Sequence, residues 1–277
     1  MSDAEDLYLD LMKKCLTAYI YDESSNRRLT VSPEKWYRPK ELLKTIALGL
    51  AKRCNWEIQR RIPFDPEKRA SGRDWPGFGY TMVGLKRLDN IQACVQSVLD
   101  NNVLGDFLEA GVWRGGATIF MRAILRIRGV NNRNVWLADS FEGMPTPDTE
   151  ECSADKGYDL SSCEYLAATL DDVKANFERF GLLDQQVKFL KGWFRDTLPN
   201  APVEKLAVLR IDADLYESTM EALSSLYVRV SKRGYVIIDD YHSWPPCRQA
   251  VDDFRIKLSV SSALEEIDGR GVFWQVT

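Results

Sequence analysis

The stretch Val208-Leu-Arg-Ile-Asp212-Ala-Asp214-Leu-Tyr-Glu-Ser-Thr219 contains a short apolar run that ends abruptly in two carboxylates, two residues apart. Such a pattern is typical of a buried parallel strand that delivers acid groups to a cleft. Asp-x-Asp can also open a turn or cap the next helix, and this segment alone leaves both interpretations open.

A second stretch, Tyr235-Val-Ile-Ile-Asp239-Asp240-Tyr241, repeats the pattern behind Gly234 and favours the strand interpretation. In a parallel sheet both runs would bring their carboxyl ends to one edge, where open α/β folds bind their ligands. Carboxylates that converge without a matching Lys or Arg repel one another unless a cation lies among them. A hard divalent metal such as Mg²⁺ suits an all-oxygen site, so a metal centre is predicted where the ends of the two runs meet.

The composition of the 277-residue chain, 45% hydrophobic and 28% charged, suits one large globular domain with or without an N-terminal extension. Its formal net charge of −4 and its pI near 5.3 give no general electrostatic case for binding nucleic acid or an anionic membrane. We therefore expect a small-molecule substrate.

The six cysteines include no C-x-x-C pair, and the chain has one histidine, so neither a zinc site nor a disulfide framework is predicted. The N-terminal sequence Met-Ser-Asp-Ala-Glu-Asp lacks the basic region of a signal peptide. No apolar run approaches the roughly 20 residues that a bilayer span needs. We expect a soluble, cytoplasmic protein.

The first 80 residues are expected to form N-terminal helices and a covering loop, ahead of a main domain over 81–277. Apolar spacings predict amphipathic helices over 5–21 and 40–60, and a further helix over 81–101. The stretch 60–80 is rich in Gly, Pro, Arg and aromatic residues. It is either a surface linker or a mobile cover over the active site, and its aromatic residues favour the cover.

The sequence Gly105-Asp-Phe-Leu-Glu109-Ala-Gly111-Val-Trp-Arg-Gly115-Gly116 predicts a strand, a glycine-rich turn and the start of a helix. Glycines let the backbone approach a ligand closely, and the helix N-terminus offers unpaired N–H groups. The spacing Glu-x-Gly-x-x-x-Gly differs from the G-x-G-x-x-G of dinucleotide sites, and Glu109 would repel a pyrophosphate. A ligand without phosphates, such as S-adenosylmethionine, is therefore favoured, and a plain tight turn is the alternative.

The run Val135-Trp-Leu-Ala-Asp139-Ser140 predicts a second strand that ends in an acid. An acid at this place in a βαβ unit commonly accepts hydrogen bonds from ribose hydroxyls. The long acidic loop over 141–164 is predicted to be functional or disordered, because loops of this length are uncommon in compact domains. Strand and helix alternate from 105 to 258, which predicts a doubly wound α/β domain.

Four motifs together resemble the macrocin O-methyltransferase (TylF-like) family, from about Leu7 to the C-terminus. They are the Glu-x-Gly turn, Asp139-Ser-Phe-Glu-Gly-Met, the run Arg210-Ile-Asp-Ala-Asp-Leu-Tyr-Glu-Ser-Thr, and Ile238-Asp-Asp-Tyr. The resemblance implies a class I methyltransferase fold with a mostly parallel seven-stranded sheet, S-adenosylmethionine as donor, Mg²⁺ and a homodimer. It also implies methylation of a sugar hydroxyl on a glycosylated natural product such as a macrolide or an aminocoumarin.

Carried over residue by residue, the resemblance makes Asp212, Asp239 and Asp240 the metal ligands and Asp214 the catalytic base. Asp214 lies one strand period beyond Asp212, so both side chains are expected to face the same side. The resemblance places a further group of residues around the methyl donor, namely Thr81, Met82, Glu109, Gly111, Asp139 and Ser140. The region 22–75 shows no confident match, so the acceptor is not carried over.

Other interpretations remain open at this point. His242 is predicted to be a loop residue in preference to a catalytic one, and Arg210 is predicted to form a structural ion pair. A catechol-type O-methyltransferase would need the same acids. A nicotinamide-dependent dehydrogenase is disfavoured by Glu109 and by the missing G-x-G, and a binding protein with a relic site would be expected to lose one of the acids.

Overall fold

A seven-stranded sheet forms the centre of the protein, in the order β5-β4-β3-β6-β7-β9-β8. The computed structural model describes residues 3–21, 25–28, 39–54, 56, 58–150 and 152–277. The strands are β3 (Asp106–Ala110), β4 (Val135–Asp139), β5 (Val187–Lys191), β6 (Leu206–Ile211), β7 (Val230–Ile238), β8 (Glu265–Glu266) and β9 (Val272–Gln275). β9 runs antiparallel to both β7 and β8 and the remaining pairs are parallel, which confirms the predicted mostly parallel, doubly wound sheet.

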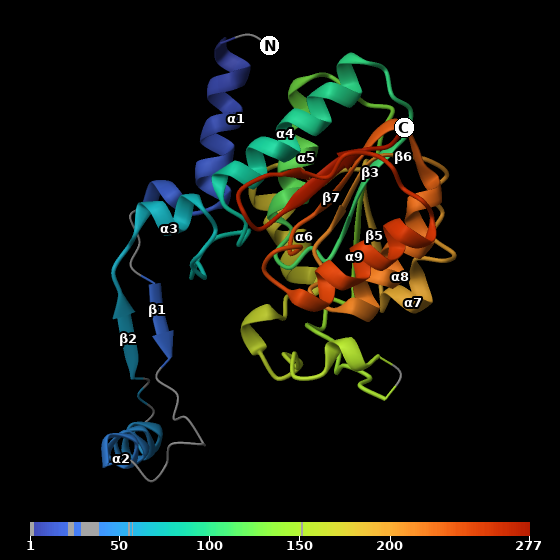
Figure 1. Ribbon diagram of the computed structural model, residues 1–277. Helices are drawn as coiled ribbons and strands as arrows, with labels where there is room; N and C mark the ends of the chain where they lie inside the picture. The colour runs from blue at the N-terminus through green and yellow to red at the C-terminus, as the bar shows by residue number, and fades with distance from the viewer. Residues whose placement is uncertain (1–2, 22–24, 29–38, 55, 57, 151) are drawn as a thin grey trace.

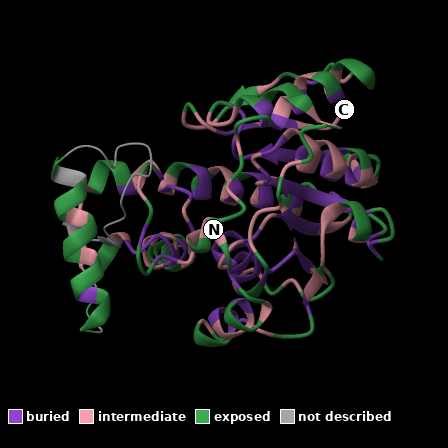
Figure 2. Ribbon diagram, turned by 90° about the horizontal axis from the view of Figure 1, so that it is seen from below, coloured by how far each residue is buried: buried purple, intermediate pink, exposed green. Residues whose placement is uncertain are grey.

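Helices cover both faces of this sheet: α4 (Leu85–Asp100), α5 (Gly116–Ile127), α6 (Leu170–Arg179), the short α7 (Phe194–Thr197), α8 (Tyr216–Leu226) and α9 (Pro245–Lys257). One hydrophobic core joins the sheet to α4, α5 and α6, and a second core joins it to α8 and α9 (Figure 1). β6 is buried at every position because helices pack on both of its sides. The central strands accordingly form the buried interior of the molecule (Figure 2).

The N-terminal part packs on the sheet domain through α1 (Asp3–Leu16), which buries Leu9, Met12 and Leu16. A 3₁₀ turn over Tyr19–Tyr21 follows it, so the helix predicted over 5–21 ends early.

Beyond this turn, β1 (Ser25–Arg28) and β2 (Gln59–Ile62) pair as an antiparallel ribbon that carries α2 (Pro39–Arg53), and the short α3 (Pro66–Ala70) follows β2. Figure 1 shows the ribbon and α2 reaching away from the sheet domain. α2 leaves an apolar stripe exposed at Leu42, Leu43, Ile46 and Leu50. The ribbon was not predicted. The helix predicted over 40–60 ends at Arg53, and positions 59 and 60 belong to β2 instead, so the prediction was wrong at its C-terminal end. Residues 55 and 57 lie outside the described ranges.

Two further segments differ from the sequence prediction. The helix predicted over 81–101 begins only at Leu85, so Thr81 and Met82 precede it in irregular structure. The loop over 141–164 contains a 3₁₀ turn at Ser153–Asp155, and a second such turn follows at Glu164–Leu166. Within the described ranges, the helices are too short or too polar to cross a bilayer.

Candidate active site

The predicted site residues gather at the carboxyl ends of three neighbouring strands, β3, β6 and β7. Glu109 lies in β3, Asp212 directly follows β6, and Asp239 and Asp240 directly follow β7. The strand order reverses between β3 and β6, which is where open α/β sheets bind their ligands. The strand interpretation of both Asp-containing runs is therefore confirmed.

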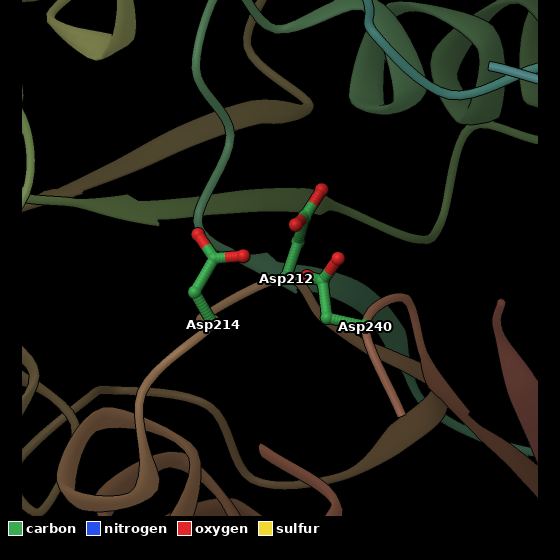
Figure 3. Close-up of side chains that lie close together, drawn as sticks. All are labelled: Asp212, Asp214 and Asp240. Carbon is green, nitrogen blue, oxygen red and sulfur yellow. The ribbon is translucent and has the colours of Figure 1, made fainter. Parts of the chain in front are cut away.

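Three carboxylates converge at this edge. Asp212, Asp214 and Asp240 each offer a carboxylate oxygen, and these oxygens lie within 4.8 Å of one another (Figure 3). Oxygen Oδ2 of Asp240 is buried and has no hydrogen-bond partner among the described residues. A cluster of this kind, with an unsatisfied buried oxygen, fits a hard divalent cation in donor type and spacing.

Asp239 lies outside that cluster and is held by two arginines. Its two oxygens form ion pairs with Arg210 of β6 and Arg87 of α4, all of them buried. Arg210 also pairs with Glu109 and lies 3.0 Å from Oδ2 of Asp212. The expectation that no basic residue matches these acids was wrong. Arg210, predicted to form a structural ion pair, pairs with two of the three predicted metal ligands, Asp212 and Asp239, and with Glu109. Arg87 lies 152 residues from Asp239 in sequence, so no local pattern could have identified it.

The negative charge of Asp239 is compensated, whereas that of Asp214 and Asp240 is not. Burial raises the pKa of Asp239, but Arg210 and Arg87 outweigh burial and hold the pKa below its usual range. Burial and the neighbouring Asp214 and Asp212 raise the pKa of Asp240 well above its usual range. Burial, with Asp212 and Asp239, raises the pKa of Asp214 to about 8. Negative charge is therefore left in excess around Asp214 and Asp240, where a cation could take the place of protons.

Asp214 reaches the cluster through a turn and not through strand alternation. β6 ends at Ile211, and Asp214 has a left-handed backbone with φ of 54°. The strand-period argument was therefore wrong, although the two side chains do face each other.

Asp214 also does not cap the following helix, α8. The N–H groups of Tyr216 and Glu217 donate instead to the carboxylate of Asp155, at 2.6 and 3.1 Å. Asp155 is fully buried and belongs to the 141–164 loop, so it fastens that loop to the site. Its role was missed, because the two partners are 61 and 62 residues away in sequence.

The glycine-rich turn is fixed by close backbone contacts on both sides. Gly111 has φ of 84°, and a Cβ there would overlap the carbonyl oxygen of Asp212. Asp139 accepts a 2.8 Å hydrogen bond from the N–H of Val112 and another, also of 2.8 Å, from that of Phe141. Asp139 thereby holds the glycine-rich turn at the carboxyl ends of the strands. Gly116, the first residue of α5, follows this turn.

A cavity of about 310 Å³ extends from this turn to Asp212, the member of the carboxylate cluster that lines it. Gly111, Asp139, Ser140 and Asp212 line it, at the ends of β3, β4 and β6. Part of the 141–164 loop, at 143–148, also lines it. Sequence reasoning missed the rest of the lining, which comes from Trp193, Phe194 and Arg195 after β5, from Ala213, and from Glu217, Ser218 and Glu221 of α8. Trp193 and Phe194 follow a strand end as Asp139 does, and that signal could have identified them.

The cavity lining does not include three residues predicted to surround the donor. Glu109 is buried against Arg210, and its Oε2 has no hydrogen-bond partner within the described part of the chain. Thr81 is buried, and its hydroxyl accepts a hydrogen bond from the N–H of Val83. Met82 lies in the same segment, which contacts Gly116 through the carbonyl of Tyr80.

His242 lies beside the carboxylates without joining them. Its Nε2 is 3.3 Å from Glu266, and its backbone N–H donates to the carbonyl of Arg270. This placement is the loop position that the sequence predicted.

Proteins similar to this chain over nearly its whole length are known. A family model described as macrocin-O-methyltransferase (TylF) matches residues 5–276. An 8-demethyl-8-(2,3-dimethoxy-alpha-L-rhamnosyl)-tetracenomycin-C 4'-O-methyltransferase of Streptomyces olivaceus is 49% identical over 276 residues, 99% of this chain and 94% of the relative. A demethyldecarbamoylnovobiocin O-methyltransferase of Streptomyces niveus is 45% identical over 272 residues, 98% of this chain and 94% of the relative.

The solved structure of the O-methyltransferase NovP shares the whole architecture. It has a TM-score of 0.84 and 43% identity, and the match covers 99% of each chain. The family model and these relatives span the chain from its N-terminal helix to the last strand, including the strand-end acids and the glycine-rich turn. The chain therefore belongs to the macrocin O-methyltransferase (TylF) family.

Proposed function

We propose that this chain transfers a methyl group from S-adenosylmethionine to a sugar hydroxyl of a glycosylated natural product, with Mg²⁺ bound next to the acceptor. Its relatives are O-methyltransferases, and membership of the family implies S-adenosylmethionine as the donor. The name of one relative specifies a rhamnosyl group. The observation that carries the proposal is the cluster of Asp212, Asp214 and Asp240 beside a cavity that begins at the glycine-rich turn.

For the donor, we propose that Gly111, Asp139 and Ser140 contact the nucleoside half of S-adenosylmethionine in the cavity. All three line it at the ends of β3 and β4. Glu109, Thr81 and Met82 would then support the glycine-rich turn without lining the cavity. Glu109 is ion-paired to Arg210, and Thr81 and Met82 lie in the segment that contacts the first residue of α5.

For the cation, we propose Asp212, Asp239 and Asp240 as ligands. Asp212 and Asp239 share one guanidinium nitrogen of Arg210, so their carboxylates are adjacent. An ionised carboxylate accepts about four hydrogen bonds or ligand contacts, so Asp239 can keep its arginines and still face a cation. Asp214 is the alternative third ligand, since it is the one grouped with Asp212 and Asp240.

When bound, Mg²⁺ would supply Lewis-acid orientation of two adjacent sugar hydroxyls and a lower pKa for the one that reacts. The protein groups do the rest of the work. The cavity holds the donor in line with the acceptor oxygen, at the near-attack separation of ~3 to 3.5 Å that methyl transfer needs. Asp214, beside the same cavity edge, accepts the hydroxyl proton as the methyl group arrives.

Titration calorimetry with S-adenosylmethionine, Mg²⁺ and NADH, followed by a methyl-transfer screen, tests this proposal. We expect binding of the first two, no binding of NADH, and product with glycosylated acceptors. Product only from catechols would favour the catechol-type alternative. NADH binding without S-adenosylmethionine binding would favour a dehydrogenase.

Replacing Asp139 with asparagine is expected to weaken donor affinity by about 1 to 3 kcal/mol, the scale of one lost charged hydrogen bond. The carboxylate lines the cavity and also holds the turn through the N–H of Val112. Calorimetric titration with S-adenosylmethionine measures the change. Asp106→Asn is the matched control, because Asp106 accepts similar bonds from Asn134 and Trp136 at the opposite end of β3. Unchanged donor affinity together with weakened acceptor binding would contradict the assignment.

A further inference from the structure

Trp113, in the middle of the glycine-rich turn, has a backbone conformation that a bulky residue rarely adopts. Its φ is 46°, in the left-handed region. For a residue other than glycine this conformation is strained, and it persists only where the surroundings enforce it. The turn therefore depends on whatever holds the Trp113 side chain.

Tyr165 is the main partner that holds it. The indole Nε1 of Trp113 donates a 2.9 Å hydrogen bond to the carbonyl of Tyr165, and the two rings lie 5.3 Å apart. The ring of Tyr165 stacks on Trp75 at 4.9 Å with an interplanar angle of 12°, and its hydroxyl donates to the carbonyl of Pro76 at 2.7 Å. Tyr165 is thus fixed on one side by the 60–80 cover and fixes Trp113 on the other.

Arg114 contacts both Trp113 and Tyr165. Its guanidinium lies 4.2 Å from the ring of Trp113 and 5.5 Å from that of Tyr165. It also donates to the carbonyls of Gly77 and Gly79, at 3.0 and 2.9 Å. The chain just beyond the 141–164 loop and the 60–80 cover therefore meet on the glycine-rich turn.

The conformation of Trp113 matters for the cavity because it orients backbone donors. The N–H groups of Val112 and Trp113 both point at Asp139, with the Val112 bond at 2.8 Å, and Asp139 lines the cavity. Tyr165 itself is not among the lining residues. A change at Tyr165 therefore acts on the cavity through its neighbours, and the contact with Trp113, which leads to Asp139, is one such route.

We propose that Tyr165 is a positioning residue for the methyl donor, which holds Trp113 in its left-handed conformation and so sets Asp139 at the cavity edge. The inference rests on the proposed function, in which this cavity binds S-adenosylmethionine. It predicts that donor affinity depends on a side chain that the donor does not touch. It also predicts that the ring of Tyr165 matters more than its hydroxyl, because the ring makes the contacts with Trp75 and Trp113.

The experiment measures the affinity of S-adenosylhomocysteine, a stable donor analogue, by titration calorimetry on the full chain. Tyr165→Leu is expected to weaken binding roughly tenfold, the scale of losing a stacked aromatic pair and part of a hydrogen bond. Tyr165→Phe keeps the ring and is expected to restore most of the affinity. Tyr158→Leu is the matched control: Tyr158 is equally half-buried in the 141–164 loop and packs at 5.7 Å on Trp244, away from the turn.

A second pair of variants separates positioning from simple loosening of the fold. Glycine adopts positive φ without strain, so Trp113→Gly relieves the strain of the turn, whereas Trp113→Ala keeps the strain and loses the ring contacts that enforce the conformation. We expect Trp113→Gly to bind the analogue more tightly than Trp113→Ala, although glycine is the more flexible residue.

Three outcomes would overturn the inference. Unchanged affinity in Tyr165→Leu would remove the role of Tyr165, and equal losses in Tyr165→Leu and Tyr158→Leu would reduce it to general loosening of the loop. Tighter binding by Trp113→Ala than by Trp113→Gly would exclude a role for the left-handed backbone conformation of Trp113 in donor binding. If the wild-type chain fails to bind the analogue at all, the proposed function falls with it, which distinguishes that failure from the first three.

Discussion

Replacing Asp240 with asparagine is expected to remove most of the turnover and most of the Mg²⁺ affinity, while the fold stays intact. Oδ2 of Asp240 is buried without a partner in the described structure, so this carboxylate is poised to bind a cation. Its pKa is raised well above the usual range by burial, Asp214 and Asp212. A neutral amide of the same shape should therefore replace this buried carboxylate at little cost in stability.

We expect at least about a 10²-fold loss of activity and Mg²⁺ affinity, because even partners outside a metal's ligand shell contribute 10- to 100-fold. Titration calorimetry with Mg²⁺, steady-state turnover and thermal unfolding measure the three quantities separately. Full turnover of the wild-type enzyme in excess chelator would exclude the cation requirement altogether.

Asp239→Asn changes the same site but also breaks buried ion pairs, so it is the comparison variant for Asp240→Asn. Both oxygens of Asp239 pair with buried arginines, Arg210 and Arg87. Removing the charge leaves both guanidiniums partly uncompensated, and breaking a buried pair typically costs about 3 to 5 kcal/mol. We therefore expect Asp239→Asn to lower thermal stability as well as activity, whereas Asp240→Asn lowers activity alone.

Asp214→Asn is expected to lower kcat by about 10² to 10⁴, the usual contribution of a general base. Donor affinity and Mg²⁺ affinity should stay nearly unchanged if Asp214 only accepts the proton. The cation acidifies the reacting hydroxyl, so some activity should remain. Steady-state kinetics at saturating donor and Mg²⁺, with calorimetry for both ligands, measure the effect.

The competing roles of Asp214 give different results in this experiment. A helix-capping role is already disfavoured, since Asp155 takes the N–H groups of Tyr216 and Glu217. Loss of Mg²⁺ affinity as large as that of Asp240→Asn would make Asp214 the third ligand. A large loss in His242→Ala with almost none in Asp214→Asn would transfer the proton to the histidine.

The local pattern of the sequence determined the sheet and the edge at which the acids meet. Short apolar runs such as Val208–Ile211 are typical of strands that are buried on both faces, as in a parallel sheet. Parallel strands place their carboxyl ends at the same edge of the sheet. The glycine at position 111 is likewise a local requirement, because a positive φ and a close backbone neighbour both demand it. These features depend on a few consecutive residues, so they could be predicted.

The tertiary structure alone decided how the charges pair and how the segments 60–80 and 141–164 are held. Arg87 reaches Asp239 across 152 residues, and Asp155 caps a helix that begins 61 residues later. The β1–β2 ribbon joins two polar segments, Ser25–Arg28 and Gln59–Ile62, that carry no apolar alternation to predict their pairing. Burial is what makes such contacts strong, since an unpaired charge in the interior is costly, and burial depends on the whole chain having folded. The sequence therefore places the acids at one edge, and the packing of distant segments decides which of them remain free to bind a cation.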